Sequence, residues 1–131
     1  MSQTVTARRN VGVGLAAGVL GALVAFALIF SVTANAAPQK LVATVGPGST
    51  ISLKTVTGKR VGTLTRGAYS IVVKNRSDEH NFHVRGPGVS KAFTGVDFIG
   101  TKTVNVRLGS GRYAFVCTPH LDEMHGSFSV R

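Results

Sequence analysis

The chain has 131 residues, of which 15 are basic, 5 are acidic and 44% are hydrophobic, and its formal net charge is +10. This length is enough for one domain and excludes a multidomain enzyme or a long repeat array, while the apolar content excludes a disordered tail. The single cysteine excludes an intrachain disulfide, and with it a cysteine-rich secreted scaffold.

The first 36 residues have the pattern of an export segment. Arg8-Arg9 precedes an uncharged stretch of 22 residues, 11–32, and the small residues Ala34 and Ala36 follow it. A basic start, an apolar core and a small-x-small exit predict a signal peptide cleaved after Ala36. An uncleaved membrane anchor is the alternative, because 22 helical residues would reach about 33 Å, enough to span a bilayer core. Both readings predict an apolar N-terminal helix and an exported protein, whether periplasmic, extracellular or attached to the cell envelope.

Residues 37–131 carry the pattern of a β domain. Their apolar residues recur with a period of two, many are β-branched, and glycine- and proline-containing turn signals separate them. Seven short strands with no amphipathic helix predict a small antiparallel β-sandwich. The strands are expected at 41–45, 51–56, 69–74, 81–84, 101–108, 112–117 and 127–130.

The candidate metal ligands of this domain fall in two short segments. His80 and His83 lie in the first, and Cys117, His120, Met124 and His125 lie within nine residues in the second. A strand end fixes Cys117, a turn through a proline returns His120, and a further short loop returns Met124. With one imidazole from the first segment, this makes two imidazoles, a thiolate and a thioether, the ligand set of blue-copper electron transfer.

The pattern Cys-x-x-His-x-x-x-Met, followed by x-Gly-x-Phe-x-Val, resembles the C-terminal ligand loop and last strand of small secreted bacterial cupredoxins, the blue copper proteins of the plastocyanin and amicyanin kind. The pair His80-Asn81 resembles their upstream ligand. The resemblance implies a cupredoxin-like Greek-key β-sandwich holding one copper ion in a type 1 site. It implies His80, Cys117, His120 and Met124 as ligands, with Asn81 stiffening the Cys117 region through hydrogen bonds.

Two further histidines lie outside this minimal set and are alternative ligands. His83 is three positions from His80, so in a regular strand it points to the opposite face and is expected at the surface. His125 adjoins Met124 and competes with it for the axial position, which the sequence leaves open between the two.

The charge pattern bears on function and partners. Residues 37–131 have a net charge of +8, but the basic residues are dispersed and tryptophan is absent, which argues against nucleic-acid binding. No pair of carboxylates suits acid–base catalysis, so we expect no enzyme. The resemblance predicts a carrier of single electrons by Cu(I)/Cu(II) cycling. We expect a monomer that contacts the membrane only through an uncleaved N-terminal segment. The positive charge predicts attraction to an acidic redox partner or to an anionic polymer of the envelope. The alternatives are a copper sequestration or delivery protein without redox turnover, and a β-sandwich interaction module whose metal site stays empty.

Overall fold

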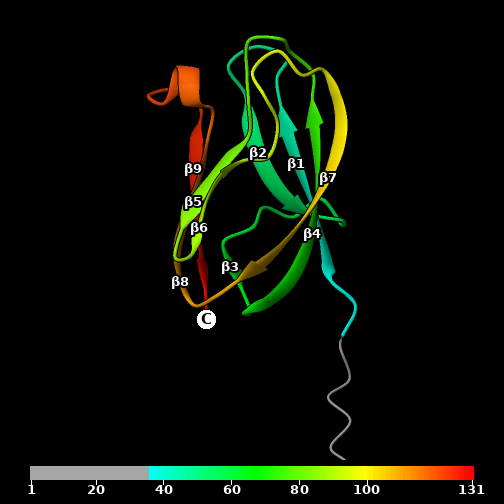
Figure 1. Ribbon diagram of the computed structural model, residues 1–131, viewed down its shortest axis with the longest axis vertical. Coiled ribbons are helices and arrows are strands. Elements are labelled where there is room, and N and C mark those ends of the chain that lie inside the picture. Colours follow the sequence, from blue (N-terminus) through cyan, green and yellow to red (C-terminus); the bar gives the residue numbers. More distant parts are fainter. Residues whose placement is uncertain (1–35) are drawn as a thin grey trace, which may run out of the picture. The chain divides into compact units, whose positions relative to one another are not determined.

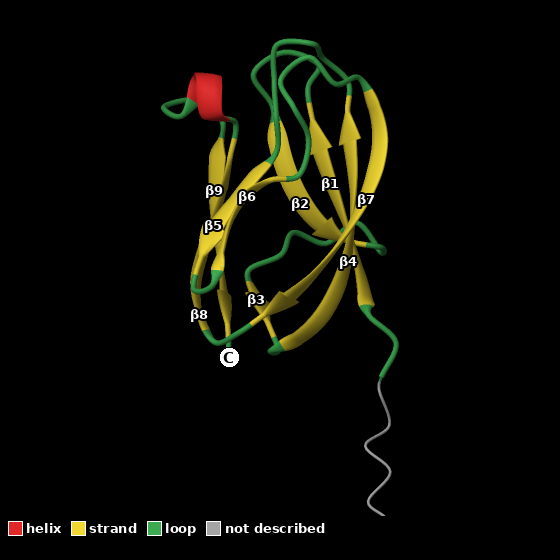
Figure 2. Ribbon diagram, in the orientation of Figure 1, coloured by secondary structure: helices red, strands yellow, loops and turns green. Residues whose placement is uncertain are grey.

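The computed structural model describes residues 36–131, so the predicted signal or anchor segment lies outside the described residues. Within the described part, no helix is long and apolar enough to cross a membrane. The strands form two sheets, with orders β2-β1-β4-β7 and β3-β9-β8-β5-β6 (Figures 1 and 2). Their bounds are β1 Gln39–Val45, β2 Ile51–Thr55, β3 Thr63–Leu64, β4 Gly67–Asn75, β5 His83–Gly86, β6 Val89–Ala92, β7 Gly100–Leu108, β8 Gly111–Val116 and β9 His125–Val130, with a 3-10 helix, η1, at Thr118–His120.

The predicted all-β sandwich of two sheets is confirmed, but its purely antiparallel pairing is wrong. Strand β4 runs parallel to β1, and β3 runs parallel to β9. A parallel pair needs a long connection that returns the chain to its starting end. Strands β2 and β3, which lie between β1 and β4 in the sequence, supply that connection for the first pair.

The strand expected at 81–84 begins later, at His83. Asn81 and Phe82 precede the strand, and the Phe82 N–H bonds to a side chain instead of a neighbouring strand. The Phe82 N–H donates to the Thr94 hydroxyl (3.0 Å). The two strands that the sequence did not predict, β3 and β6, are short and mostly exposed.

The core lies between the two sheets and is filled by alternate residues of the strands. In β1 the buried side chains are Leu41, Ala43 and Val45, as a period of two requires. Aromatic rings fill the space toward the second sheet, where Tyr113 and Phe128 stack with centroids 5.2 Å apart. This packing fixes the second sheet, whose strands β8 and β9 lead into and out of the candidate site.

A glycine allows one of these aromatic contacts close to the site. Phe115 lies directly over Gly126, where an added methyl group would overlap the ring. Phe115 also stacks on Phe82, with centroids 5.7 Å apart and ring planes 19° apart. The stack therefore ties β8 and β9 to the segment that carries His80 and Asn81.

Candidate metal centre

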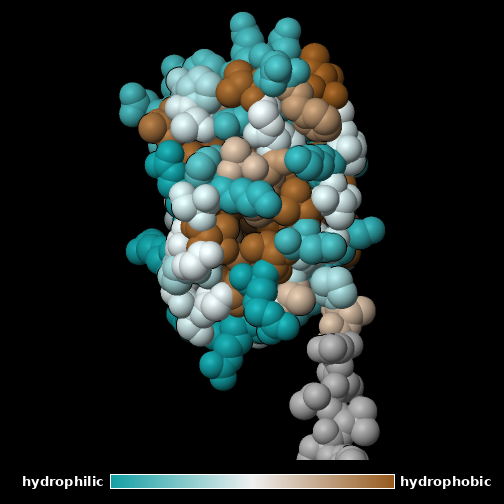
Figure 3. Space-filling view, viewed as in Figure 1, coloured by the Kyte–Doolittle hydropathy of each residue, from teal (hydrophilic) through white to brown (hydrophobic). Residues whose placement is uncertain are grey.

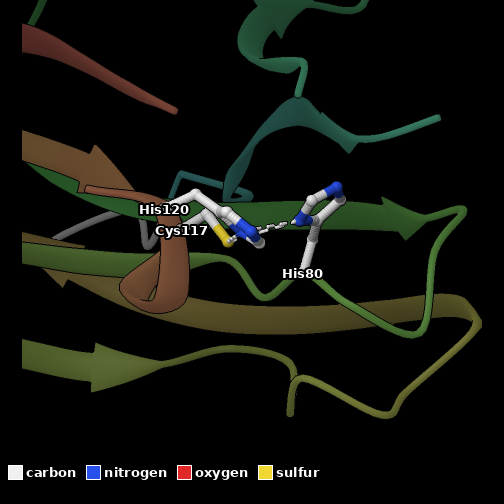
Figure 4. A group of neighbouring side chains, drawn as sticks. All are labelled: His80, Cys117 and His120. Atoms are coloured by element: carbon white, nitrogen blue, oxygen red, sulfur yellow. Dashed lines mark hydrogen bonds between the residues drawn. The ribbon is translucent and has the colours of Figure 1, made fainter. Parts of the chain in front are cut away.

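Three predicted ligands meet at one end of the sandwich. His80 lies in the connection between β4 and β5, Cys117 follows the last residue of β8, and His120 ends η1. Figure 4 shows the two imidazole rings and the cysteine sulfur directed toward one another. They form a group whose ligand atoms all lie within 4.8 Å of one another.

The spacing of these atoms matches a metal site. The two Nδ1 atoms of His80 and His120 are 3.1 Å apart, and the Cys117 Sγ lies 3.7 Å from the first and 3.6 Å from the second. The point equidistant from the three atoms of this triangle is therefore about 2.0 Å from each, close to metal–nitrogen bonds of about 2.0–2.1 Å and metal–sulfur bonds of about 2.3 Å. One ion fits between the three donors without rearrangement of the chain.

The group is shielded from solvent on all sides but one. Cys117 is fully buried and His80 is 3% exposed, whereas His120 is half-buried. The neighbours of His120 in the loop, Pro119 and Leu121, are exposed. The His120 ring is therefore the part of the site closest to the surface.

The loop of residues 117–124 is held by its own backbone. The Cys117 N–H donates to the Met124 carbonyl (2.9 Å), and the Met124 N–H donates to the His120 carbonyl (2.8 Å). The His120 N–H in turn donates to the Cys117 carbonyl (3.1 Å). Pro119 suits the first turn of η1, because its fixed φ is helical and it has no N–H to satisfy. The thiol and the imidazole are thus set on a closed, hydrogen-bonded turn.

Asn81 joins the two halves of the site. Its side-chain amide donates to the Thr118 hydroxyl (2.7 Å), and its Oδ1 accepts from the Thr118 N–H (2.7 Å). Thr118 directly follows Cys117, so these bonds tie the residue after the thiol to the segment that carries His80. We refer to this pair of residues as the Asn81–Thr118 clasp.

Two positioning residues were not identified from the sequence. Asn75, which is 2% exposed at the end of β4, donates from its side-chain amide to the His80 carbonyl (2.6 Å). Gly46 has φ +69°, which favours glycine, and an added methyl group would lie 3.2 Å from the Ser77 Cβ and in ordinary contact with the His80 ring. An asparagine at a strand end and a glycine beside a proline are turn signals, and neither distinguishes a metal site from an ordinary turn.

The other predicted residues lie around this group. Met124 is fully buried, and its backbone bonds to Cys117 and His120 place it next to the site. His125 is exposed, with its Nδ1 2.9 Å from the Leu121 carbonyl. Both stay candidates for the axial position.

His83 is separate from the metal group. It lies half-buried in β5, 3.4 Å from the Ser90 hydroxyl. Burial, and then the charge of Arg85, lower the pKa of His83 below its usual value of 6.5. The imidazole is therefore neutral over most of the physiological range.

No protein-family model matches the sequence, and a search of curated proteins found no significant match. Solved structures do match. The copper protein rusticyanin is 16% identical over 70% of this chain and 76% of its own, with a TM-score of 0.50. Reduced rusticyanin is 18% identical over 70% and 78%, with a TM-score of 0.51. A reduced amicyanin variant is 17% identical over 72% and 85%, with a TM-score of 0.48.

These findings define the fold. The chain has the cupredoxin fold, and its His80–Cys117–His120 group is typical of type 1 copper sites. Among solved structures, rusticyanin is a copper protein with this fold.

Proposed function

We propose that the protein is an exported, monomeric electron carrier with one copper ion in a type 1 site. The observation that carries this proposal is the His80–Cys117–His120 triangle, whose sides are already those of a metal site. Bound copper would supply one-electron chemistry by alternating between Cu(I) and Cu(II). In this proposal the chain is a carrier and not an enzyme.

The donor set favours copper over zinc. Structural zinc sites in proteins are four-coordinate and use several thiolates, or two thiolates with two imidazoles. Here a single thiolate meets two imidazoles, and Met124, as the proposed fourth ligand, would add a thioether. A soft sulfur pair suits the reduced ion, and imidazole suits both oxidation states.

The residues around the site hold it rigid, and rigidity supports fast electron exchange. The Asn81–Thr118 clasp and the backbone bonds of the 117–124 loop fix the ligands from both sides. Little rearrangement is then needed when the charge of the ion changes. The half-buried ring of His120 is the proposed route by which the electron enters and leaves.

A second candidate function is copper sequestration or delivery without redox turnover. The observation in its favour is His125, an exposed imidazole one residue after Met124. An exposed imidazole is a suitable intermediate ligand when copper passes to another protein.

The visible absorption spectrum of the full chain with one equivalent of Cu(II) separates the two functions. An intense blue or green band that ascorbate bleaches and an oxidant restores supports electron transfer. Cys117→Ser should abolish the band, because the thiolate is its source. A pale spectrum with copper still bound would reject the type 1 site and favour delivery.

A matched pair of variants tests the upstream ligand. His80→Ala should abolish tight copper binding, because it removes one corner of the ligand triangle. His83→Ala, three residues away and hydrogen-bonded to Ser90 instead, should leave binding unchanged. The reverse result would show that His80 is not the ligand.

A further inference from the structure

The acidic residues of the chain gather at the metal-bearing end of the domain. The end is made by four loops, 46–50, 76–82, 93–99 and 117–124, which we call the metal end. They lie together because the last residue of β4 pairs with the last of β1 and the first of β7. The last residue of β1 also pairs with the first of β2, and the last of β8 pairs with the first of β5 and of β9. All five carboxylates lie in these loops and are exposed: Asp78, Glu79, Asp97, Asp122 and Glu123.

The basic residues are distributed in the opposite way. Of the 13 in the described part of the chain, only Arg76 lies in a metal-end loop. Lys74 and Lys91 are the closest on the strands, each one residue from the pair that ends its strands there, and Lys102 is two residues from that end. The far end carries Lys40, Arg66, Arg107, Arg112 and Arg131, with the Arg66 N–H bonded to the Arg131 carbonyl (2.9 Å). A chain with a large positive net charge therefore has a negative metal end.

Exposed apolar side chains accompany the carboxylates. Four large hydrophobic residues of the described part are exposed, and three of them lie in metal-end loops: Val96 (37%), Ile99 (62%) and Leu121 (43%). Figure 3 shows hydrophobic and hydrophilic side chains next to one another at the loop end of the face it displays, at the top of the view. Apolar contacts with a charged surround are the usual composition of a transient protein interface.

We propose that the metal end docks on a basic face of a partner protein. The purpose of this docking, electron exchange near His120, rests on the proposed function. The docking itself needs no copper. The positive net charge of the whole chain alone would predict an acidic partner. The negative charge of the metal end outweighs it there, because the basic far end is too distant to act at the metal end. Strand β4 has nine residues and is about 30 Å long, whereas salt screens exposed charges over about 8 Å at physiological ionic strength.

The partner's chemistry follows from this arrangement. An acidic face would meet five carboxylates and one arginine at the metal end, and that repulsion would be strongest at the electron's exit. Lysine or arginine side chains around a small apolar contact would complement both the charge and the exposed Val96, Ile99 and Leu121. The basic far end would meanwhile point away from such a partner.

The first test uses two redox-inert paramagnetic ions on the metal-free full chain in a non-ionic detergent. Hexaamminechromium(III) should broaden the NMR signals of backbone amides in the metal-end loops. Hexacyanochromate(III) should broaden those near Arg66, Arg112 and Arg131. A small basic protein, lysozyme, should then shift the metal-end amides and no others. The proposal is overturned if lysozyme shifts the far-end amides or none, or if the hexacyanide ion collects at the metal end.

Paired variants separate local from net charge. Asp122→Asn with Glu123→Gln removes two charges at the metal end and should weaken the lysozyme-induced shifts several-fold. Arg112→Gln with Arg131→Gln removes two charges at the far end and should leave those shifts unchanged. Equal effects from both pairs would show that only the total charge matters and would overturn the proposal.

A kinetic test uses the copper-loaded chain. Hexaammineruthenium(II) gives one electron to oxidised copper and becomes ruthenium(III). Although both reactants have a positive net charge, the rate should fall several-fold between about 10 and 200 mM salt, because attraction at the metal end is screened. A rate that rises with salt would overturn the docking proposal and leave electron transfer standing. If the chain binds copper without redox turnover but still contacts lysozyme at the metal end, the proposed function is rejected and the docking proposal stands.

Discussion

The Asn81–Thr118 clasp gives the sharpest test of how the site is held. Asn81→Ala removes the side-chain amide that donates to the Thr118 hydroxyl and the oxygen that accepts from the Thr118 N–H. Asn81 is 5% exposed, whereas Thr118 is exposed, so water can meet the Thr118 groups once the amide is gone. At about 1 kcal/mol for each bond, the loss is about 2 kcal/mol.

Chemical denaturation of the metal-free chain measures this loss. For a domain of this size each kcal/mol also lowers the melting temperature by about 4–8 °C. Thr118→Val keeps the backbone bond to Asn81 and removes only the hydroxyl, so it should cost about 1 kcal/mol. The double variant should cost no more than Asn81→Ala alone. If the free energy of unfolding of Asn81→Ala is within about 0.5 kcal/mol of that of the unaltered chain, the clasp contributes little to stability and the reasoning is wrong.

Three further predictions concern residues around the site. Gly126→Ala should cost about 1–3 kcal/mol, because the methyl group displaces the Phe115 ring, whereas Gly109→Ala, with open space around it, should be neutral in the same denaturation assay. Met124→Leu should retain most of the absorption band of the copper-loaded chain and lower the free energy of unfolding by less than about 1.5 kcal/mol. It should also shift the reduction potential measured by voltammetry. If the potential is unchanged in Met124→Leu and shifts in His125→Ala, the axial ligand is His125. Because the folded chain lowers the pKa of His83 below 6.5, the unfolded chain binds more protons in the window just below that pH, so stability is lost as pH falls through it. His83→Gln should reduce the loss measured between pH 7 and pH 5, and an equal loss in both chains would contradict the assignment.

The strands that could be predicted from the sequence are those that bury one face. In β1 and β4, and in β8 up to Phe115, buried residues alternate with more exposed ones, and the period of two is visible in their sequences. β6 could not be found in this way, because three of its four residues are exposed and their pattern is that of a loop. The parallel pairing of β1 with β4 is also invisible in the sequence, because it depends on where the intervening chain returns and not on any local pattern.

The site shows the same division between local and distant information. The spacing of Cys117 and His120 is local, and a strand end followed by a proline turn explains how they meet. The approach of His80 depends on a contact between two segments far apart in the sequence, and only the family resemblance indicated it. The Asn75 hydrogen bond to the His80 carbonyl could not be predicted, because that asparagine meets the carbonyl only after β4 has ended and the chain has turned.

The burial of Cys117 has a consequence for the metal-free chain. The susceptibility of a cysteine to oxidation follows its exposure, and the only thiol of this chain is 0% exposed in the folded domain. The sandwich itself, with no metal present, therefore protects the sulfur from sulfenic acid formation and from mixed disulfides. If the chain binds copper as proposed, folding before the metal arrives would keep the sulfur available as a ligand.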